Sequence, residues 1–303
     1  MYSRTRIILH VFTIITGLAW AMIECSCGRE TDKESSQVNL SYTINWDKVF
    51  ESYSKPEKLR YCFYPVNGGP LLRTDGDCKG FKIILPADKY NVLIFNCDAS
   101  DIEFNNLESF DKAEARLIAT KAIGSNTNGK IPLYGLTITD LQINPGQDIE
   151  EIMQPTPLVK EIFFDINIDG SEYINSCKGS LSGVASALNL SKRQVMPDTP
   201  TTVNIETSLT DKGAKGSALI LGVATQIGEG EDQPNTPSNQ LTLDFTLADG
   251  STFTTTADLG HDLADKHQSG IHVDIDATVS PSPTFTVTIN SWKITSGDSI
   301  AIK

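Results

Sequence analysis

The sequence predicts an all-β protein made of two tandem antiparallel β-sandwiches. Apolar and polar residues alternate in short runs along most of the chain, which is the pattern of strands with one buried face. Gly, Asp, Asn and Pro residues separate these runs and mark tight turns between them. The chain has 303 residues, enough for two domains of ordinary size that each bury a core.

Strands are expected throughout the first half of the chain. The first two alternating runs place the following side chains on a common face of each strand: Val38, Leu40, Tyr42 and Ile44, then Leu59, Tyr61 and Phe63. A turn signal at residues 66–70 precedes two further runs, at 81–86 and 90–96. Residues 109–122 are ambiguous, because their composition suits a helix while their apolar residues also alternate.

A boundary between domains is expected where Pro155 and Pro157 flank Thr156, because these prolines discourage both helix continuation and sheet pairing. The predicted sandwiches are residues 38–154 and 158–303. Strands of the second sandwich are expected at 160–168, 201–210, 217–228, 239–259, 272–279 and 283–294. Asp249 and Gly250 mark a hairpin turn, and residues 179–194 fit either a short helix or a packed crossover.

The first residues have the layout of an export signal. Arg4 and Arg6 precede an apolar run at 7–23, which is slightly short for a stable membrane span. We therefore predict a signal peptide at residues 1–26. Residues 27–37 are polar and are predicted to form a flexible tether between the membrane and the first sandwich.

Two cysteines end this leader. Cleavage of a bacterial lipoprotein signal leaves a cysteine whose thiol receives the lipid, and Cys27, which follows the small residue Ser26, fits that role better than Cys25. We predict lipid attachment at Cys27. The alternative is ordinary cleavage near Ala21.

Charge and cysteine content limit the partners and the compartment. The net charge of -13 argues against nucleic acid and anionic lipid headgroups as partners. Four cysteines remain after the leader: Cys62, Cys78, Cys97 and Cys177. In an oxidising compartment they predict either two disulfides or one disulfide with two buried thiols. Their spacing matches no metal-ligand motif.

Two segments could suggest a metal ion. Asp165, Asn167 and Asp169 alternate before Gly170, like the first half of a calcium loop, but the twelfth position is Ser176 and the preceding residues form a strand pattern. A strand that ends in an Asp-Gly turn is the better interpretation.

The histidines of the second half also lie close together in sequence. They are His261, His267 and His272, with Asp262 and Asp265 between them. Their spacing suits neither one helix face nor one strand face, so a helical turn leading into a strand is expected. No catalytic motif occurs in the chain, and we predict no catalytic residue, metal site or cofactor.

Aromatic residues could form a sugar-stacking surface. Trp46 and Trp292 each lie in an alternating segment, however, which favours packing in a core or between sheets.

Several segments together resemble a known family. They are residues 44–50, 56–69, 81–110, 180–190 and 285–293. On these segments the chain resembles the anchor-type fimbrial subunits of the Bacteroidales type V pilus system, the FimB-like lipoproteins. The family pattern LP-x-x-x-Y-x-x-L-x-x-N is matched by Leu85, Pro86, Tyr90, Leu93 and Asn96.

The resemblance implies tandem transthyretin-like sandwiches in a non-enzymatic, surface-exposed lipoprotein of the outer membrane and fimbrium. It also implies that the protein joins other fimbrial subunits by β-strand exchange. Shaft subunits of that system lose a first strand by cleavage after a basic residue, whereas an anchor keeps its first strand. Arg116 lies in the kind of segment where such a cleavage position would be sought, and it equally fits an exposed strand position.

The sheet edges expected to take part in assembly are residues 38–46 and 285–303. Two other classes remain open at this point. One is a glycan-binding surface lipoprotein beside an outer-membrane importer, which would show exposed aromatic residues on one face; the other is a hydrolase, for which a catalytic motif is missing. A host or glycan ligand also remains open for a fimbrial subunit.

Overall fold

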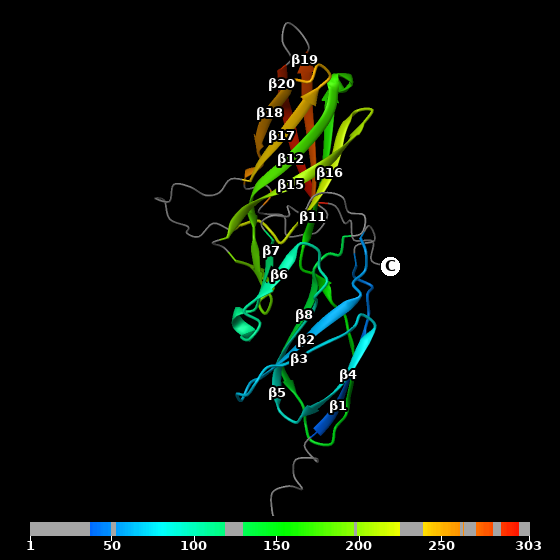
Figure 1. The fold of residues 1–303 in the computed structure, drawn as a ribbon, viewed down its shortest axis with the longest axis vertical. Helices are drawn as coiled ribbons and strands as arrows, with labels where there is room; N and C mark the ends of the chain where they lie inside the picture. Colours follow the sequence, from blue (N-terminus) through cyan, green and yellow to red (C-terminus); the bar gives the residue numbers. More distant parts are fainter. Residues whose placement is uncertain are drawn as a thin grey trace, which may run out of the picture.

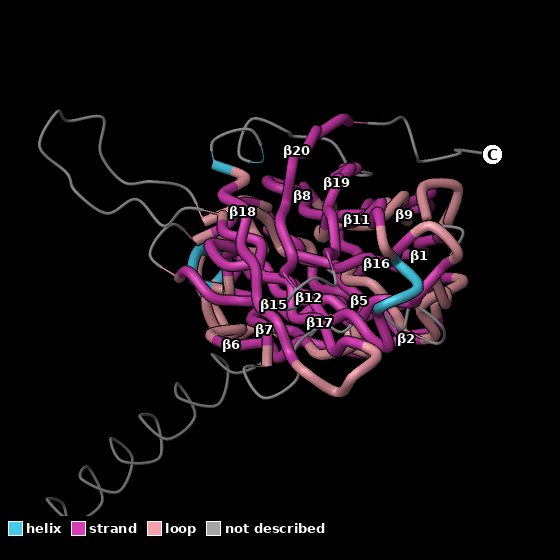
Figure 2. Tube along the Cα trace, turned by 90° about the horizontal axis from the view of Figure 1, so that it is seen from above, coloured by secondary structure: helices cyan, strands magenta, loops and turns pink. Residues whose placement is uncertain are grey.

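The computed structural model describes residues 37–49, 53–118, 130–196, 199–224, 239–260, 263, 271–280 and 286–296. The described chain is an elongated assembly of strands joined by loops, with only short helical turns (Figures 1 and 2). The predicted all-β fold class is confirmed.

The first eight-stranded sheet is built from residues 37–157 and is called the first sandwich below. Its strands are β1 (Gln37–Ile44), β2 (Lys58–Pro65), β3 (Leu72–Asp77), β4 (Gly80–Pro86), β5 (Lys89–Asn96), β8 (Tyr134–Gln142), β9 (Ile149–Met153) and β10 (Thr156–Pro157). Their order in the sheet is β10-β8-β5-β2-β3-β4-β1-β9. Strands β3 and β4 pair only at Asp77 and Gly80, so the sheet folds there and brings β4-β1-β9 over β2 and β5.

The core of the first sandwich follows the predicted alternation. Val38, Leu40 and Tyr42 of β1 are each 1% exposed and pack against apolar side chains of β2, β4 and β5. Strands β2 and β5 are buried on both faces, since Cys62 and Phe95 point to the opposite side and join a second cluster. A third layer must therefore cover that side of β2 and β5.

This third layer is a four-stranded sheet, called the junction sheet below, with the order β14-β13-β7-β6. Its strands are β6 (Ile102–Asn105), β7 (Glu114–Leu117), β13 (Ala187–Asn189) and β14 (Gln194–Val195). Phe104 of β6 packs against Phe95 with ring centroids 4.6 Å apart. The antiparallel pairing of β7 with β13 joins segments from the two halves of the chain.

Both ambiguous segments contribute to the junction sheet. Residues 109–118 contain the short 3-10 helix η1 (Phe110–Lys112) followed by β7, so their alternation was the better guide, and residues 119–122 lie outside the described part of the chain. Residues 179–194 form the end of β12 and then β13, so a helix at this place is wrong.

The second eight-stranded sheet is called the second sandwich. Its strands are β11 (Lys160–Asp169), β12 (Ile174–Ala185), β15 (Pro200–Thr210), β16 (Gly213–Ile220), β17 (Gln240–Leu247), β18 (Thr252–Asp258), β19 (Ile271–Ser280) and β20 (Thr286–Ser296). They follow the order β18-β17-β12-β15-β16-β11-β19-β20. The predicted hairpin is confirmed, because β17 and β18 pair across Asp249 and Gly250, whose φ is +84°.

The two sandwiches repeat one strand order. The series β8-β5-β2-β3-β4-β1-β9 corresponds, strand for strand, to β18-β17-β12-β15-β16-β11-β19. In both, the first strand pairs antiparallel on one side and parallel on the other: β1 with β4 and β9, and β11 with β16 and β19. The second sandwich adds β20 beyond β19, whereas in the first sandwich β9 is the last strand of the sheet.

Candidate assembly edges

Strand β1 lies inside its sheet. It pairs with β4 from Gln37 to Thr43 and with β9 from Leu40 to Ile44. The prediction that residues 38–46 form a free edge is therefore wrong. Strand β9, which lies more than a hundred residues later in the sequence, pairs with the side of β1 that was expected to be free. The first sandwich already holds its own first strand.

Trp46 lies just beyond β1 and is partly buried, in agreement with the predicted packing. Its indole N–H donates a hydrogen bond to the Cys78 carbonyl at 2.7 Å, and its ring meets Tyr134 edge-on with centroids 5.6 Å apart.

Strand β20 is an edge strand, as predicted for the C-terminal segment. It pairs only with β19, and its neighbour across the opening of the sandwich is the other edge strand, β18. Val287 is buried and Ile289 and Ile294 are partly buried, but Trp292 is 42% exposed. The predicted core packing of Trp292 is thus wrong, since an edge strand has no further strand to cover its inner side chains. Residues 285 and 297–303 lie outside the described chain.

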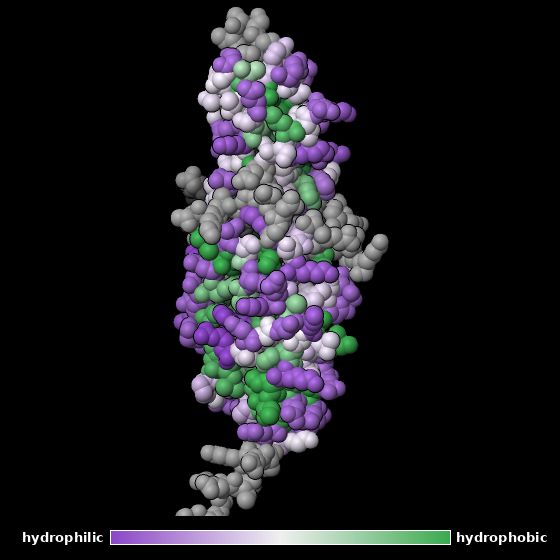
Figure 3. Space-filling view, turned by 45° about the vertical axis from the view of Figure 1, so that its right-hand side comes forward, coloured by the Kyte–Doolittle hydropathy of each residue, from purple (hydrophilic) through white to green (hydrophobic). Residues whose placement is uncertain are grey.

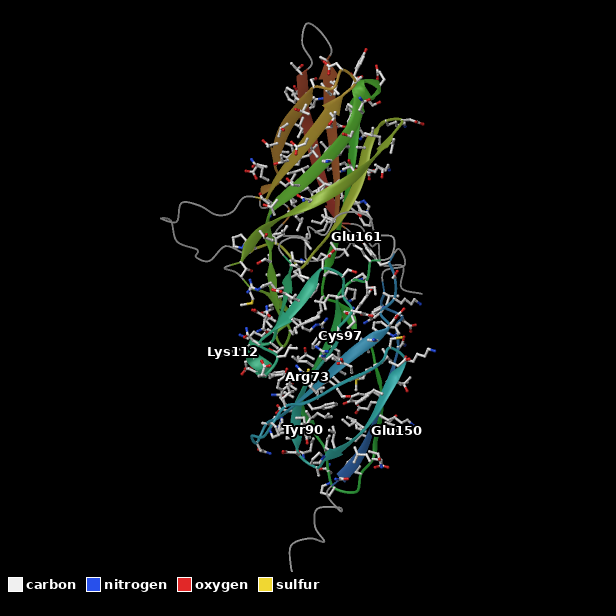
Figure 4. All side chains as sticks on the ribbon, in the orientation of Figure 1. Arg73, Tyr90, Cys97, Lys112, Glu150 and Glu161 are labelled. Atoms are coloured by element: carbon white, nitrogen blue, oxygen red, sulfur yellow. The ribbon has the colours of Figure 1, made fainter. Side chains whose placement is uncertain are left out.

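The two sandwiches meet at a buried polar contact near the junction sheet. The Tyr53 hydroxyl donates a hydrogen bond to the Glu161 carboxylate at 2.6 Å, and Glu161 is 5% exposed. Burial raises the pKa of Glu161, and the hydrogen bond from Tyr53 opposes that rise. Figure 4 shows Glu161 between the two sandwiches. Arg116 lies on β7 of the junction sheet, half-buried beside Glu114 at 3.4 Å.

The predicted alternative to a calcium loop is confirmed. Strand β11 ends at Asp169, and Gly170 follows with a φ of +88°. Asp165 forms an ion pair with Lys215 at 2.7 Å, and the Asn167 amide donates to Asp276 at 3.4 Å. Among the described residues, no three His, Cys, Asp or Glu side chains gather in a way that could hold a metal ion.

Of the clustered histidines, the structure describes His272 alone. Its ring stacks on that of Phe163, with centroids 4.8 Å apart, on neighbouring strands β19 and β11. His261, His267, Asp262 and Asp265 lie outside the described residues.

The four cysteines after the leader are free thiols, so the prediction of at least one disulfide is wrong. Cys62 is buried in β2 and Cys177 in β12, on different sandwiches, and burial raises the pKa of each thiol to about 11. Cys78 and Cys97 are partly exposed. Cys25 and Cys27, with the lipid predicted at Cys27, lie outside the described residues.

The described surface carries several open grooves formed by strand and turn residues. The grooves have volumes of about 360 to 510 Å³; one is lined by residues of β1, β4 and β9, and the others by residues of β11, β15, β16, β19 and β20 and the turns beside them. The exposed large apolar side chains of the described residues include a single aromatic one, Trp292. The clustered aromatic face expected of the glycan-binding alternative is therefore not present on this part of the chain. No helix within the described residues is long and apolar enough to cross a bilayer.

The fold and its surface define a class: an all-β sandwich protein whose distinctive features are unpaired strand edges. The chain belongs to the family DUF5119, a domain of unknown function, whose model matches residues 26–206.

One curated relative carries a descriptive name. The chain is 26% identical over 156 residues to the "Putative fimbrium anchoring subunit Fim4B" of Bacteroides ovatus. The match covers 49% of this chain and 46% of the relative, so the chain spans about half the length of the curated relative it matches.

Solved structures share the fold. A protein of Bacteroides ovatus described as a "putative adhesin" superposes with a TM-score of 0.58 at 21% identity, over 86% of this chain and 95% of that one. The fimbrial anchor protein Mfa2 of Porphyromonas gingivalis superposes with a TM-score of 0.56 at 12% identity, over 86% of this chain and 98% of that one. At these identities the likeness establishes the fold alone.

Proposed function

We propose that this protein is a non-enzymatic fimbrial anchor or accessory subunit at the cell surface, which joins other subunits by β-strand exchange. The name of the relative from Bacteroides ovatus supports the fimbrial role, and so does the fold shared with a fimbrial anchor protein. The absence of an aromatic platform on the described surface leaves the glycan-binding alternative without a supporting observation.

The observation that carries the proposal is the contrast between the occupied first-strand position, which β1 fills, and the free edge of β20. The slot between β4 and β9 is already filled by β1, which buries Val38, Leu40, Tyr42 and Ile44 there. A subunit whose first strand is in place cannot receive a partner's strand at that position. The edge strand β20, in contrast, has an incompletely covered inner row and an unpaired backbone edge, which is the kind of surface that β-augmentation uses. A first-strand position that is already filled and an open edge at β20 suit a subunit that terminates a fibre.

Lipid at Cys27 would attach the protein to the outer membrane. Strand β1 begins at Gln37, ten residues after Cys27 (37 minus 27), and a tether of that length reaches about 35 Å when extended. Strand β1 lies at the end of the molecule opposite the second sandwich (Figure 1). This arrangement would hold β20 away from the membrane, where other subunits could reach it. We also propose that the subunit consists of two domains, residues 38–154 and residues 158–303.

The test shortens the open edge at its C-terminal end. Deletion from Thr295 onward takes away the end of β20 and the tail that follows it. We expect the shortened protein to stay folded and membrane-bound but to lose copurification with fimbrial subunits from the native host. A control with Glu172→Lys, a single exposed substitution at the turn after β11, should copurify normally. Normal incorporation of the shortened protein into fibres would disprove a role for the end of β20 and the residues after it.

A further inference from the structure

The repeated strand order reveals an unoccupied position in the first sandwich. In the second sandwich, β20 pairs antiparallel along the outer edge of β19 from Ile271 to Ser280. The equivalent strand of the first sandwich is β9, and none of the described residues pairs with its outer edge. The place that β20 takes beside β19 is therefore open beside β9.

The edge of β9 is held in position for pairing. Asn39 of β1 donates to the Asp148 carboxylate with its backbone N–H and its side-chain amide, at 3.1 to 3.2 Å, just before β9 begins. At the other end, the Asn45 N–H donates to the Met153 carbonyl at 2.8 Å. Because peptide groups alternate in direction along a strand, the N–H and C=O of Ile152 then point away from β1. The side chain of Ile152 is 74% exposed.

The charges on β9 indicate what kind of strand fits there. Glu150 and Glu151 are exposed on β9, and Figure 4 shows Glu150 at the outer side of the sandwich beside β1 and β4. Glu151 is the register partner of Tyr42, and its charge contributes to the raised pKa of that tyrosine, although burial is the larger cause. The second sandwich shows such a pairing at the equivalent place. Asp274 of β19, the strand that corresponds to β9, lies opposite the basic residue Lys293 of β20.

Apolar surface accompanies these acids. Three exposed large apolar side chains belong to the first sandwich: Val66, Ile84 and Ile152. Figure 3 shows apolar surface gathered over this sandwich among charged residues. A groove of about 360 Å³ runs between β4, β1 and β9, and its lining includes Ile84, Ile149 and Glu150. Lys82 of β4 also lines this groove, and Lys82 and Glu150 are both register partners of Ser41, whereas Glu151 is paired with Tyr42.

We propose that the outer edge of β9 binds an extended segment of a partner protein, in which a lysine or arginine stands among alternating apolar residues. The segment would pair antiparallel with β9, as β20 does with β19, and its basic residue would face Glu151. A second copy of this chain is a poor occupant, because its net charge is -13 and it would be repelled. This surface is separate from β20 and does not depend on the proposed fimbrial role.

The test uses the mature protein and a synthetic peptide with blocked ends that has the sequence of Thr286–Ser296, the strand from the equivalent position. We expect saturable one-to-one binding by titration calorimetry. Glu151→Lys should weaken binding about tenfold, since it replaces a cross-strand attraction by a repulsion. A peptide with Lys293→Glu should prefer the Glu151→Lys protein to the original protein. Glu172→Lys, at the far end of the second sandwich, is the charge-matched control and should bind the original peptide normally.

A backbone variant separates edge pairing from simple charge attraction. Ile152→Pro removes an N–H that points away from β1, so the internal pairing of β9 is kept while the free edge loses a donor. We expect this variant to stay folded by circular dichroism and to lose peptide binding. Absence of saturable binding, or equal binding by the original, Glu151→Lys and Ile152→Pro proteins, would overturn the proposal. Because the copurification test of β20 uses neither variant, each idea can fail alone.

Discussion

Removal of one buried hydroxyl should make this protein more stable. Tyr42 of β1 is 1% exposed, and its hydroxyl has no hydrogen-bond partner among the described residues. A buried polar group without a partner costs about 1–3 kcal/mol of stability, because it leaves water without compensation. Tyr42→Phe keeps the packed ring and removes that group. We therefore expect the free energy of unfolding to rise by about 1 kcal/mol or more.

The matched control is another buried tyrosine, whose hydroxyl makes a hydrogen bond. Tyr64 is 8% exposed and donates to the Leu107 carbonyl at 2.8 Å. Tyr64→Phe should lower the free energy of unfolding by about 1–2 kcal/mol, since it also leaves that carbonyl unpaired. Tyr61, whose hydroxyl is likewise without a partner among the described residues, offers a second test: Tyr61→Phe should behave like Tyr42→Phe.

Urea unfolding followed by tryptophan fluorescence measures these differences. With a slope of about 3 kcal/mol per molar urea, a change of 1.5 kcal/mol moves the midpoint by about 0.5 M. The expected signs are opposite, upward for Tyr42→Phe and downward for Tyr64→Phe. If Tyr42→Phe lowers the midpoint as much as Tyr64→Phe does, the Tyr42 hydroxyl has a partner and the reasoning from its burial is refuted.

Three further predictions concern the junction, a hairpin and the leader. Because burial raises the pKa of Glu161 above its ordinary value of 4.5, the charged carboxylate costs stability at neutral pH, and this cost disappears as the pH falls from the raised pKa towards 4.5. The difference in stability between Glu161→Gln and the original protein, measured in thermal melts, should therefore shrink over that pH range, and a constant difference would contradict the prediction. Gly213 has a φ of +141°, and a Cβ there would lie 2.0 Å from the Ile166 carbonyl oxygen, so Gly213→Ala should cost about 1–3 kcal/mol in urea unfolding, whereas Gly146→Ala, with open space around its Cβ position, should cost less. Cys27→Ala with Cys25 intact should release the protein from the membrane fraction, and retention there would move the lipid to Cys25 or imply an uncleaved leader.

Local patterns predicted the strands well because alternation reports burial of one face directly. The buried row of β1 and the hairpin at Asp249 and Gly250 were both predicted from neighbouring residues alone. The order of strands in each sheet was not predicted in this way. Strand β9 carries Glu150, Glu151 and Ile152 as exposed residues, so its five positions show no strand alternation, and its pairing with β1 depends on residues more than a hundred positions apart.

The same limit explains the errors at Trp292 and at the cysteines. Trp292 lies in an alternating run, but the run belongs to an edge strand whose inner face is only half covered. The number and spacing of the four cysteines do not show which of them lie close together in the fold. The two buried ones, Cys62 and Cys177, lie in different sandwiches. The strand order that the two sandwiches share was not predicted either, because it depends on pairings between residues far apart in the sequence.

The junction sheet has a consequence for how the protein could carry force between a membrane tether and a partner. On the proposed function, a pull acts between β1, near the tether, and β20, near the subunit that it joins. The path between them passes through the contact of the two sandwiches. There β7 pairs with β13 along an antiparallel ladder, and the Tyr53 hydroxyl binds the buried Glu161 carboxylate. The Thr137 hydroxyl also donates to the Leu190 carbonyl at 3.1 Å. These contacts add to the chain connection at residues 155–157, so the junction should resist separation of the sandwiches better than that connection alone would.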